Sequence, residues 1–434
     1  LAHHTQKIQQ KPRDAIRSRK RQRQNVQRTN MINIQEHVLT KKADNEDPIL
    51  DKDGDLFSAE HEFRGADWRG KDCNDNDAKI RPCTHEFNKD GNWGVDTNCN
   101  GIYGVSKDNH TSLEDLYCST KASANIVSRN ILTFGDSASS AFSIPPQWLK
   151  WHNLSDVAHT LDDEFDWPQL CWSTGFIKEI EGDSVYLKLL NTNRCNMRGW
   201  QNVGHNGAES LDLTFQVSVL NLSPNDKPNL VFIDYAGNDI CKDKLSKMTT
   251  PAQFKAAILA GLGKLSEVVA ADTKVLLMGV VDGSFLWDTL HNQMHPIGVT
   301  YQDLYSFLSC TGANPCGTWL TKNATERAAA SKRAAELSQT MQDIATQYTL
   351  KFPHMELAYL PFPLPEAVKF MKQYGLPLKL LIEPMDGFHP SHFAHRLFSD
   401  VVFKHLQDVL PAWVANVNPF NKDIIRMFGN QGGY

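Results

Sequence analysis

The strongest constraint on the fold is a regular alternation, after about residue 125, of short apolar runs with longer segments of helical pattern. Short apolar runs bounded by turn residues indicate buried strands. Strands that alternate with helices predict a parallel sheet covered by helices on both faces. The expected class is therefore α/β, with helices on both faces of a central parallel sheet. The predicted strands are 130–134, 184–190, 230–235, 274–280 and 355–360.

Three helices stand out in the same region. The segment 251–270 begins at Pro251, and Thr249 or Thr250 ahead of it can act as the cap. The segment 324–348 is rich in Ala, Glu, Gln and Leu, which favour helix. A last helix is predicted from about 391 to 409.

Gly135-Asp136-Ser137 follows directly after the first predicted strand. The glycine permits a sharp turn, and the polar stretch after it can begin a helix. Open α/β sheets place their functional groups at the carboxyl ends of strands, where a serine also meets helix N–H donors. Alone, the tripeptide is weak evidence, because such a sequence is more often an ordinary strand-to-helix turn.

A base for this serine is available near the end of the chain, in Asp386-Gly387-Phe388-His389-Pro390. An imidazole can accept a serine proton near neutral pH. A carboxylate three residues earlier can hold the Nδ1–H of His389 and stabilise the imidazolium. The prediction is a catalytic set of Ser137 as nucleophile, His389 as base and Asp386 as orienting group.

Donors for a tetrahedral oxyanion are predicted in two further loops that follow strands. His205-Asn206-Gly207-Ala208 follows the second predicted strand and Gly237-Asn238-Asp239 the third. The backbone N–H groups of Ser137 and Gly207 and the side-chain amide of Asn238 are the candidate donors. For Gly207 and Asn238 the plain alternative is a loop glycine and a turn residue.

The order of these blocks resembles that of the GDSL, or SGNH, hydrolase family. Gly-Asp-Ser comes first, then a glycine after the second strand, then Gly-Asn-Asp, then Asp-x-x-His-Pro. The resemblance implies an SGNH fold for residues 121–434, which is a flavodoxin-like three-layer domain around a central parallel sheet. It also implies ester hydrolysis through an acyl-enzyme.

Residues 49–120 have a different character, with many acidic and Asn residues, Gly and no apolar periodicity. Alternating oxygen side chains on a tight loop can converge on one hard cation, and Ca²⁺ takes 6–8 oxygen ligands. One such run would suit a solvated acidic loop, but three runs within fifty residues favour a small, loop-rich segment held by structural Ca²⁺ and a disulfide. The candidate ligands are Asp51, Asp53, Asp55, Asp72, Asn74, Asp75, Asp77, Asp96, Asn98 and Asn100.

Residues 49–434 as a whole are similar to the acyloxyacyl hydrolase family, in stretches such as Trp68-Arg69-Gly70 and 166–170. The resemblance implies a lipase that removes secondary acyl chains from the lipid A of lipopolysaccharide. It also implies a disulfide-linked, saposin-like subunit. Because residues 1–48 hold no cysteine, the chain is expected to begin beyond that subunit or to lack it. Trp167 and Gln169 are candidates to line the acyl pocket.

Two other functions remain open at this point. The same fold serves general phospholipases, lysophospholipases and carbohydrate esterases. A calcium-dependent lipid-binding module with a vestigial site is the alternative outside enzymes, and the complete set of catalytic positions argues against it.

Net charge and hydropathy limit the classes of partner that the chain is expected to bind. A net charge of −5 gives no general affinity for nucleic acid, and no apolar run approaches the ~20 residues that span a bilayer. Residues 1–48 are strongly basic and are expected to form a flexible arm.

Nine cysteines together with four Asn-x-Ser/Thr sequons favour a secreted or lumenal protein with disulfides. Cys310 and Cys316 are close enough in sequence to close a small loop. The odd number of cysteines leaves at least one thiol unpaired within the chain. The candidate glycosylation sites are Asn109, Asn153, Asn221 and Asn323.

Overall fold

A computed structural model describes residues 47–107, 111–119, 126–144, 165–177, 184–414 and 416–434. Nearly all of the predicted basic arm lies outside these residues. So do the sequons at Asn109 and Asn153.

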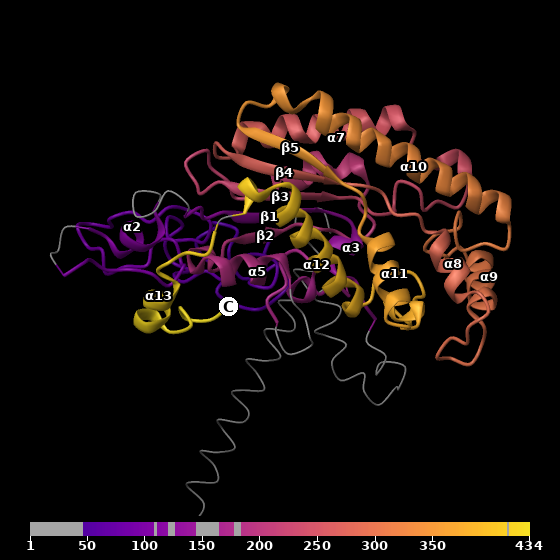
Figure 1. The fold of residues 1–434 in the computed structure, drawn as a ribbon, viewed down its shortest axis with the longest axis horizontal. Coiled ribbons are helices and arrows are strands. Elements are labelled where there is room, and N and C mark those ends of the chain that lie inside the picture. The colour runs from indigo at the N-terminus through magenta and orange to yellow at the C-terminus, as the bar shows by residue number, and fades with distance from the viewer. Residues whose placement is uncertain (1–46, 108–110, 120–125, 145–164, 178–183, 415) are drawn as a thin grey trace, which may run out of the picture.

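A five-stranded parallel sheet forms the centre of the molecule, in the order β2-β1-β3-β4-β5 (Figure 1). This confirms the predicted α/β class. The strands are β1 (Asn130–Gly135), β2 (Trp200–Asn202), β3 (Asn229–Asp234), β4 (Thr273–Met278) and β5 (Met355–Leu360). Because all strands are parallel, their carboxyl ends meet at one edge of the sheet.

Helices cover both faces of this sheet, and alternate side chains of each strand enter two separate cores. In β1, Leu132 packs into the core beneath α6, α7 and α10, whereas Ile131 packs into the core beneath α5, α11 and α12. The three-layer arrangement follows from strands that are apolar on both faces. The covering helices are α5 (Val185–Thr192), α6 (Leu213–Ser218), α7 (Pro251–Val268), α10 (Ala324–Gln347), α11 (Leu364–Gln373) and α12 (His392–Val409).

Three of these helices match the sequence prediction closely. Thr250 caps α7 by accepting from the N–H of Gln253, whose side chain accepts from the N–H of Thr250 in return. Asn323 caps α10, and Ser391 caps α12. In each case a short polar side chain satisfies helix N–H groups that have no partner within the helix.

The prediction of a strand at 184–190 is wrong, because these residues begin helix α5. The Ser184 side chain accepts from the N–H of Leu187 and starts the helix. Val185, Tyr186, Leu187, Leu189 and Leu190 are all buried. A helix buried on most sides reads as a continuous apolar run, which periodicity cannot distinguish from a buried strand. The actual second strand, β2, has only three residues.

The acidic segment packs along β2, the edge strand of the sheet. The N–H of Gly70 donates to the carbonyl of Trp200 at 2.9 Å, and the N–H of Asn202 donates to the carbonyl of Trp68 at 2.7 Å. Arg69 pairs with Gln201 as an isolated antiparallel bridge. This segment therefore continues the hydrogen bonding of the sheet.

The end of the chain returns to the acidic segment. A small core joins α2 (Leu113–Cys118) to α13 (Asn421–Phe428), and Figure 1 shows the two helices near each other at one end of the molecule. The side-chain amide of Gln431 donates to the carbonyl of Asn100 at 2.6 Å. Within the described ranges, the other helices are α3 (Ser137–Ser140), α8 (Ser284–Leu290), α9 (Tyr301–Thr311) and the 3-10 turns η3 (Pro168–Leu170), η4 (Arg194–Asn196), η5 (Ser210–Asp212), η6 (Leu245–Lys247), η7 (Thr349–Lys351), η8 (Leu378–Leu381) and η9 (Pro411–Trp413).

Three disulfides link distant parts of the chain: Cys73–Cys99, Cys118–Cys195 and Cys241–Cys316. A small loop closed by Cys310 and Cys316 is therefore wrong. Cys310 is exposed and unpaired, while Cys83 and Cys171 are buried thiols.

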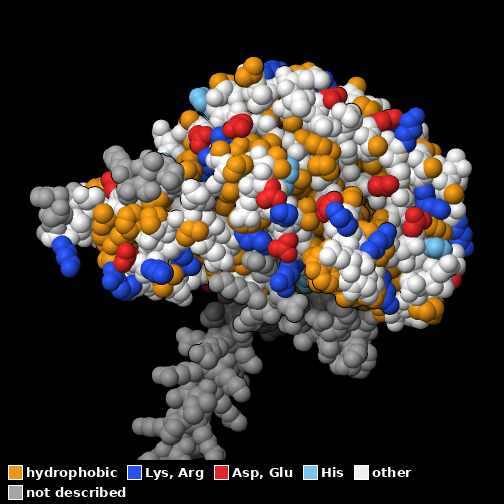
Figure 2. All heavy atoms as spheres, in the orientation of Figure 1, with side chains coloured by type: hydrophobic (Ala, Val, Ile, Leu, Met, Phe, Trp, Pro, Cys, Tyr) orange, Lys and Arg blue, Asp and Glu red, His pale blue; other side chains and the backbone are white. Residues whose placement is uncertain are grey.

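On the face shown in Figure 2, charged side chains of both signs are scattered over the surface, and hydrophobic side chains gather over α11. Within the described ranges, no helix has both the length and the apolar character needed to cross a membrane.

Candidate active site

The turn after β1 presents Ser137 at the carboxyl edge of the sheet. A Cβ at Gly135 would lie 2.0 Å from the carbonyl oxygen of Asp234 on β3, so only glycine fits there. Asp136 is the N-cap of α3, and its second oxygen accepts from the N–H of Gly237 at 3.0 Å. The carboxylate thereby ties the loops after β1 and β3 together, and it fixes Ser137 at the first position of the helix.

Ser137, His389 and Asp386 form one hydrogen-bonded chain. The Nε2 atom of His389 lies 2.7 Å from Oγ of Ser137, and Nδ1 lies 2.5 Å from a carboxylate oxygen of Asp386. Ser137 and His389 are buried, at 4% and 8% exposure. The three side chains are thus in the relative positions that a serine nucleophile, its base and an orienting carboxylate would need.

The electrostatic surroundings of His389 favour its protonated form. Burial by itself lowers the pKa of this imidazole, but the charge of Asp386 and its hydrogen bond, with the charges of Asp136 and Asp166, outweigh burial and raise the pKa above its ordinary value. Because its cationic form is stabilised, the imidazole of His389 has a higher affinity for a proton released by the Ser137 hydroxyl.

The loop that carries Asp386 is held by a buried carboxylate, Glu383. Oε2 of Glu383 accepts from the N–H of Met385 at 2.7 Å and from the N–H of Asp386 at 2.9 Å. Burial, followed by the charge of Asp386, raises the pKa of Glu383 to about 7. No residue pattern near Glu383 predicts this role, because the role depends on backbone geometry.

Asn238 lies beside Ser137 and His389 in the same cavity. Its side-chain amide donates to the carbonyl of Ala208 at 3.1 Å, which links it to the turn that contains Gly207. Gly207 has a φ of +85° and is exposed, and it is not among the residues that line the cavity. The structure brings Asn238 to the site, and the donor role of Gly207 stays a prediction.

A buried arginine from the acidic segment supports the loop before Gly207. Arg64 is 1% exposed and lies over the ring of Trp68, 3.7 Å from its centroid. Its guanidinium donates to the carbonyl of Gly204 at 3.1 Å and lies 3.2 Å from Nδ1 of His205. The acidic segment and the candidate oxyanion loop are therefore one packed unit.

A small cavity of about 60 Å³ lies against Ser137 and His389, with mostly apolar walls. These walls include side chains that the sequence did not single out, because they come from loops far apart in the chain: Val281, Phe285, Trp319, Phe362, Leu364 and Phe398. A Cβ at Gly283 would lie 2.2 Å from the Trp319 ring, so the indole packs directly on that glycine.

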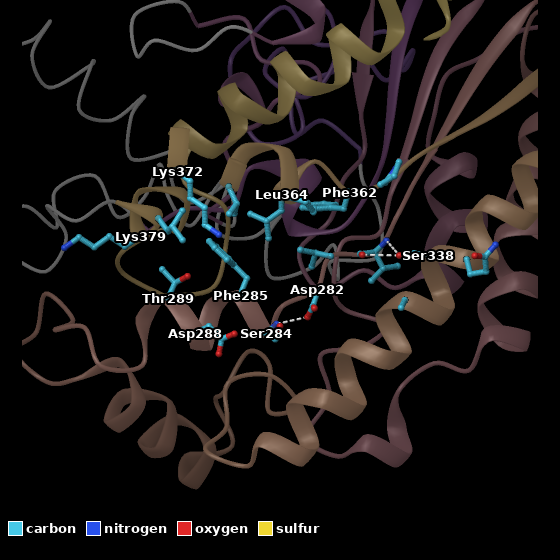
Figure 3. A pocket seen from close by; sticks show the side chains of 18 of the residues that line it. Asp282, Ser284, Phe285, Asp288, Thr289, Ser338, Phe362, Leu364, Lys372 and Lys379 are labelled. Carbon is cyan, nitrogen blue, oxygen red and sulfur yellow. Dashed lines mark hydrogen bonds between the residues drawn. The ribbon is translucent and has the colours of Figure 1, made fainter. Parts of the chain in front are cut away.

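Two larger grooves adjoin this cavity, since each shares lining residues with it. A groove of about 950 Å³ shares Val281, Phe285 and Leu364 (Figure 3). A second groove of about 880 Å³ shares Ile382. Apolar walls next to a serine–histidine pair suit an ester with a long apolar chain.

Of the two predicted pocket residues, Trp167 lines a groove and Gln169 does not. Trp167 lines the groove of about 880 Å³, and its indole N–H donates to the carbonyl of Ser143 at 2.9 Å. Gln169 is buried and is not among the lining residues of the cavity or of either groove.

Three of the predicted calcium ligands lie together. Carboxylate oxygens of Asp51, Asp53 and Asp75 lie within 4.8 Å of one another. Burial raises the pKa of Asp55 to about 8 and that of Asp72 to about 6. One oxygen of each of these two is buried without a hydrogen-bond partner among the described residues. Such a cluster fits a hard divalent cation, which would supply the missing positive charge and bind the unpartnered oxygens.

Protein groups also contact the predicted ligands, including two of the cluster: Asp75 pairs with Lys52, and Asp51 accepts from the N–H groups of Gly54 and Leu56. The Asn98 and Asn100 amides donate to the two oxygens of Glu114. Asp77 pairs with Lys89, and Asp96 accepts from the N–H of Gly101. The N–H of Asn74 donates to Asp72. The sulfur atoms near Asp72 belong to the Cys73–Cys99 disulfide and are not metal ligands.

The two sequons within the described residues differ. Asn323 is exposed at the cap of α10. Asn221 is half-buried, and its amide donates to the carbonyl of Asp55. Glycosylation at either position stays a prediction.

Comparison with known proteins agrees with this geometry. The model of the GDSL-like lipase/acylhydrolase family matches residues 131–402. Proteins named acyloxyacyl hydrolase from Oryctolagus cuniculus and Mus musculus are 39% and 38% identical over 89% of this chain and 69% of their own lengths. The human protein of the same name is 38% identical with the same coverage.

Among solved structures, an acetylxylan esterase from Geobacillus stearothermophilus matches 67% of this chain and 99% of its own, with a TM-score of 0.34 and 14% identity. The sequence relatives and the family model, which spans β1 through most of α12, identify the chain. It belongs to the acyloxyacyl hydrolase family of GDSL-type ester hydrolases.

Proposed function

We propose that this protein hydrolyses the secondary, acyloxyacyl fatty-acid esters of lipid A in lipopolysaccharide, using Ser137, His389 and Asp386. The observation that carries the mechanism is the chain of short contacts from Ser137 Oγ through His389 to Asp386. The substrate is proposed from the name shared by the relatives, and the apolar walls next to Ser137 support it.

In the first half-reaction, Oγ of Ser137 attacks the acyl carbonyl and Nε2 of His389 takes its proton. Asp386 holds Nδ1 and stabilises the imidazolium. The imidazolium then protonates the leaving hydroxyl of the remaining lipid, which leaves the fatty acyl group on Ser137. Water, activated by the same imidazole, releases the fatty acid and restores the serine.

The negative charge of the tetrahedral intermediate needs donors already in place. We assign this role to the N–H of Ser137 at the start of α3, to the Asn238 amide and to the N–H of Gly207. Each such donor contributes about 3 kcal/mol to lowering the barrier. The hydrogen bond between Asn238 and Ala208 supports the placement of two of these donors in adjoining turns.

The test is the release of fatty acids from lipopolysaccharide, with hydroxylated and non-hydroxylated acids measured separately. Release of non-hydroxylated acids alone is expected, because only the secondary chains carry the acyloxyacyl bond. Ser137→Ala should abolish release while leaving the thermal midpoint unchanged. Activity on glycerophospholipids or acetylated sugars, without activity on lipopolysaccharide, would replace this substrate with one of the alternatives.

We further propose a structural Ca²⁺ ion in the acidic segment. Asp51, Asp53 and Asp75 would hold it. Asp55 and Asp72 lie close enough for their charges to interact with this cluster of carboxylates. The ion would neutralise buried carboxylates that otherwise repel one another, and so hold a segment with few apolar residues in shape.

A secreted or lumenal location and a disulfide-linked saposin-like subunit complete the proposal. The three disulfides suit an oxidising compartment. Cys310, exposed and unpaired, is the cysteine available for a bridge to another chain. Reducing and non-reducing electrophoresis of protein from its native source, compared with Cys310→Ser, tests this bridge.

A further inference from the structure

Exposed apolar side chains gather where the grooves next to the catalytic cavity reach the surface. Met294 and Ile297, in the loop between α8 and α9, are 63% and 53% exposed. Leu380, in η8, is 45% exposed and lines the same groove as Met294. Large apolar side chains on one rim are unusual for a surface that contacts only water.

Two lysines lie along the same rim. Lys372 and Lys379 both line the groove of about 950 Å³, and Lys379 also lines the one that contains Met294 and Leu380. Figure 3 shows Lys372 directed toward Phe285 and Lys379 directed outward at the end of the groove. Lys369 nearby is paired with Glu366. Neither groove lysine has a carboxylate partner within the part of the chain that the structure describes.

The segment that carries both lysines is more basic than the chain as a whole, although Asp282 and Asp288 also line the groove of about 950 Å³. Residues 364–381 contain three lysines and one glutamate, in a chain whose net charge is −5. Figure 2 shows hydrophobic side chains over α11 with Lys or Arg side chains beside them. Apolar groups bordered by unpaired cations are the combination by which proteins bind the surface of an anionic lipid layer.

We propose that Met294, Ile297, Lys372, Lys379 and Leu380 form a docking face that rests on the surface of an anionic lipid aggregate. The lysines contact negatively charged headgroups, and the apolar side chains enter the boundary between headgroups and chains. The groove behind the face then gives an acyl chain an apolar path toward Ser137. This inference rests on the proposed function, which requires a lipid substrate, but it concerns where the lipid surface is met.

Binding to vesicles tests the face without any catalysis. The full chain, with Ser137→Ala to prevent turnover, is sedimented with phosphatidylcholine vesicles that contain or lack phosphatidylglycerol. Lys372→Ala and Lys379→Ala should each weaken binding to the anionic vesicles about fivefold. Leu380→Ser should also weaken binding. The matched controls are Lys351→Ala and Leu350→Ser, both exposed in η7 at the opposite edge of the sheet, and they should bind as before.

A label on the face separates this contact from binding by the basic residues 1–43. In a Cys310→Ser background, Met294→Cys carries an environment-sensitive fluorophore, and Leu350→Cys carries the same label as the control. Anionic vesicles should shift the emission of the label at position 294 to the blue and leave the label at 350 unchanged. Equal emission at both positions would overturn the proposal.

The outcomes distinguish this inference from the proposed function. If the rim and control variants bind vesicles equally, the docking face is wrong, whatever the enzyme hydrolyses. If the rim variants lose vesicle binding but lipopolysaccharide is not a substrate, the face stands and the substrate is wrong. A label at position 294 that shifts only on self-association of the protein would assign the rim to a second protein chain and overturn lipid docking.

Discussion

Nε2 of His389 lies 2.7 Å from Oγ of Ser137, although 252 positions separate the two residues in the chain. The contact forms because β1 ends at the same edge of the sheet that the loop before α12 reaches. Nearly the whole α/β domain must therefore be folded before His389 can contact Ser137.

The raised pKa of His389 predicts the pH dependence of activity. Only the neutral imidazole accepts the serine proton, so kcat/KM should rise with pH through a pKa above the ordinary value for histidine. The stability of the fold should change with pH in the opposite direction. The stabilisation from the His389–Asp386 pair is fully present below the unfolded pKa and is lost as pH rises through the folded pKa. A pH profile of kcat/KM, beside pH-dependent thermal midpoints, checks both.

Asp386→Asn serves as the control for this assignment. Removing the carboxylate charge should shift the profile to lower pH and lower kcat. A profile that does not move would show that another group sets the pH dependence.

Asn238→Ala should lower kcat by about 10²–10³-fold with little change in KM, because an oxyanion donor acts in the transition state. Steady-state kinetics on a soluble ester measure this split. Asn225→Ala, an exposed asparagine in the turn before β3, should leave both constants unchanged. A large rise in KM with kcat unchanged would instead assign Asn238 to binding of the substrate.

Glu383 should act as a positioning residue for Asp386. Glu383→Ala removes the acceptor of two N–H groups and should lower kcat while KM stays close to that of the wild type. Glu383→Gln retains an acceptor oxygen and should restore most of the activity. If Ala and Gln variants lose the same activity, the carboxylate charge, not the loop geometry, is what matters.

Calcium should stabilise the fold through the acidic segment. An ion bound at a hundred times its Kd adds about 2.7 kcal/mol to the free energy of unfolding, so the thermal midpoint should rise with calcium and fall with a chelator. Asp53→Asn should weaken this response. Asp423→Asn, a partly exposed aspartate in α13 paired with Arg426, is the matched control and should respond as the wild type does. A midpoint that ignores calcium would contradict the proposed site.

Much of the catalytic domain could be predicted because local signals and fold agree there. Thr250 followed by Pro251 predicts the start of α7, and the apolar run that ends at Gly135 predicts β1. The block order also predicted which loops meet, since parallel strands end at one edge. The run at 184–190 failed because burial on most sides of a helix removes the periodicity that distinguishes helix from strand.

The parts that could not be predicted depend on contacts distant in sequence. Nothing near Glu383 reveals that its carboxylate holds the loop of Asp386. Cys241 pairs with Cys316 across 75 positions, whereas the nearer Cys310 stays unpaired. The acidic segment was predicted from its oxygen side chains, but its hydrogen bonds to β2 could not be.

The hydrogen bonds between the acidic segment and β2 have a second consequence. In the sheet order, β2 is the terminal strand on one side, and residues 68–70 occupy its open hydrogen-bonding groups. An uncovered edge of this kind recruits strands from other molecules. Expressed without the acidic segment, the α/β domain should therefore self-associate through β2, so the segment protects solubility as well as shape.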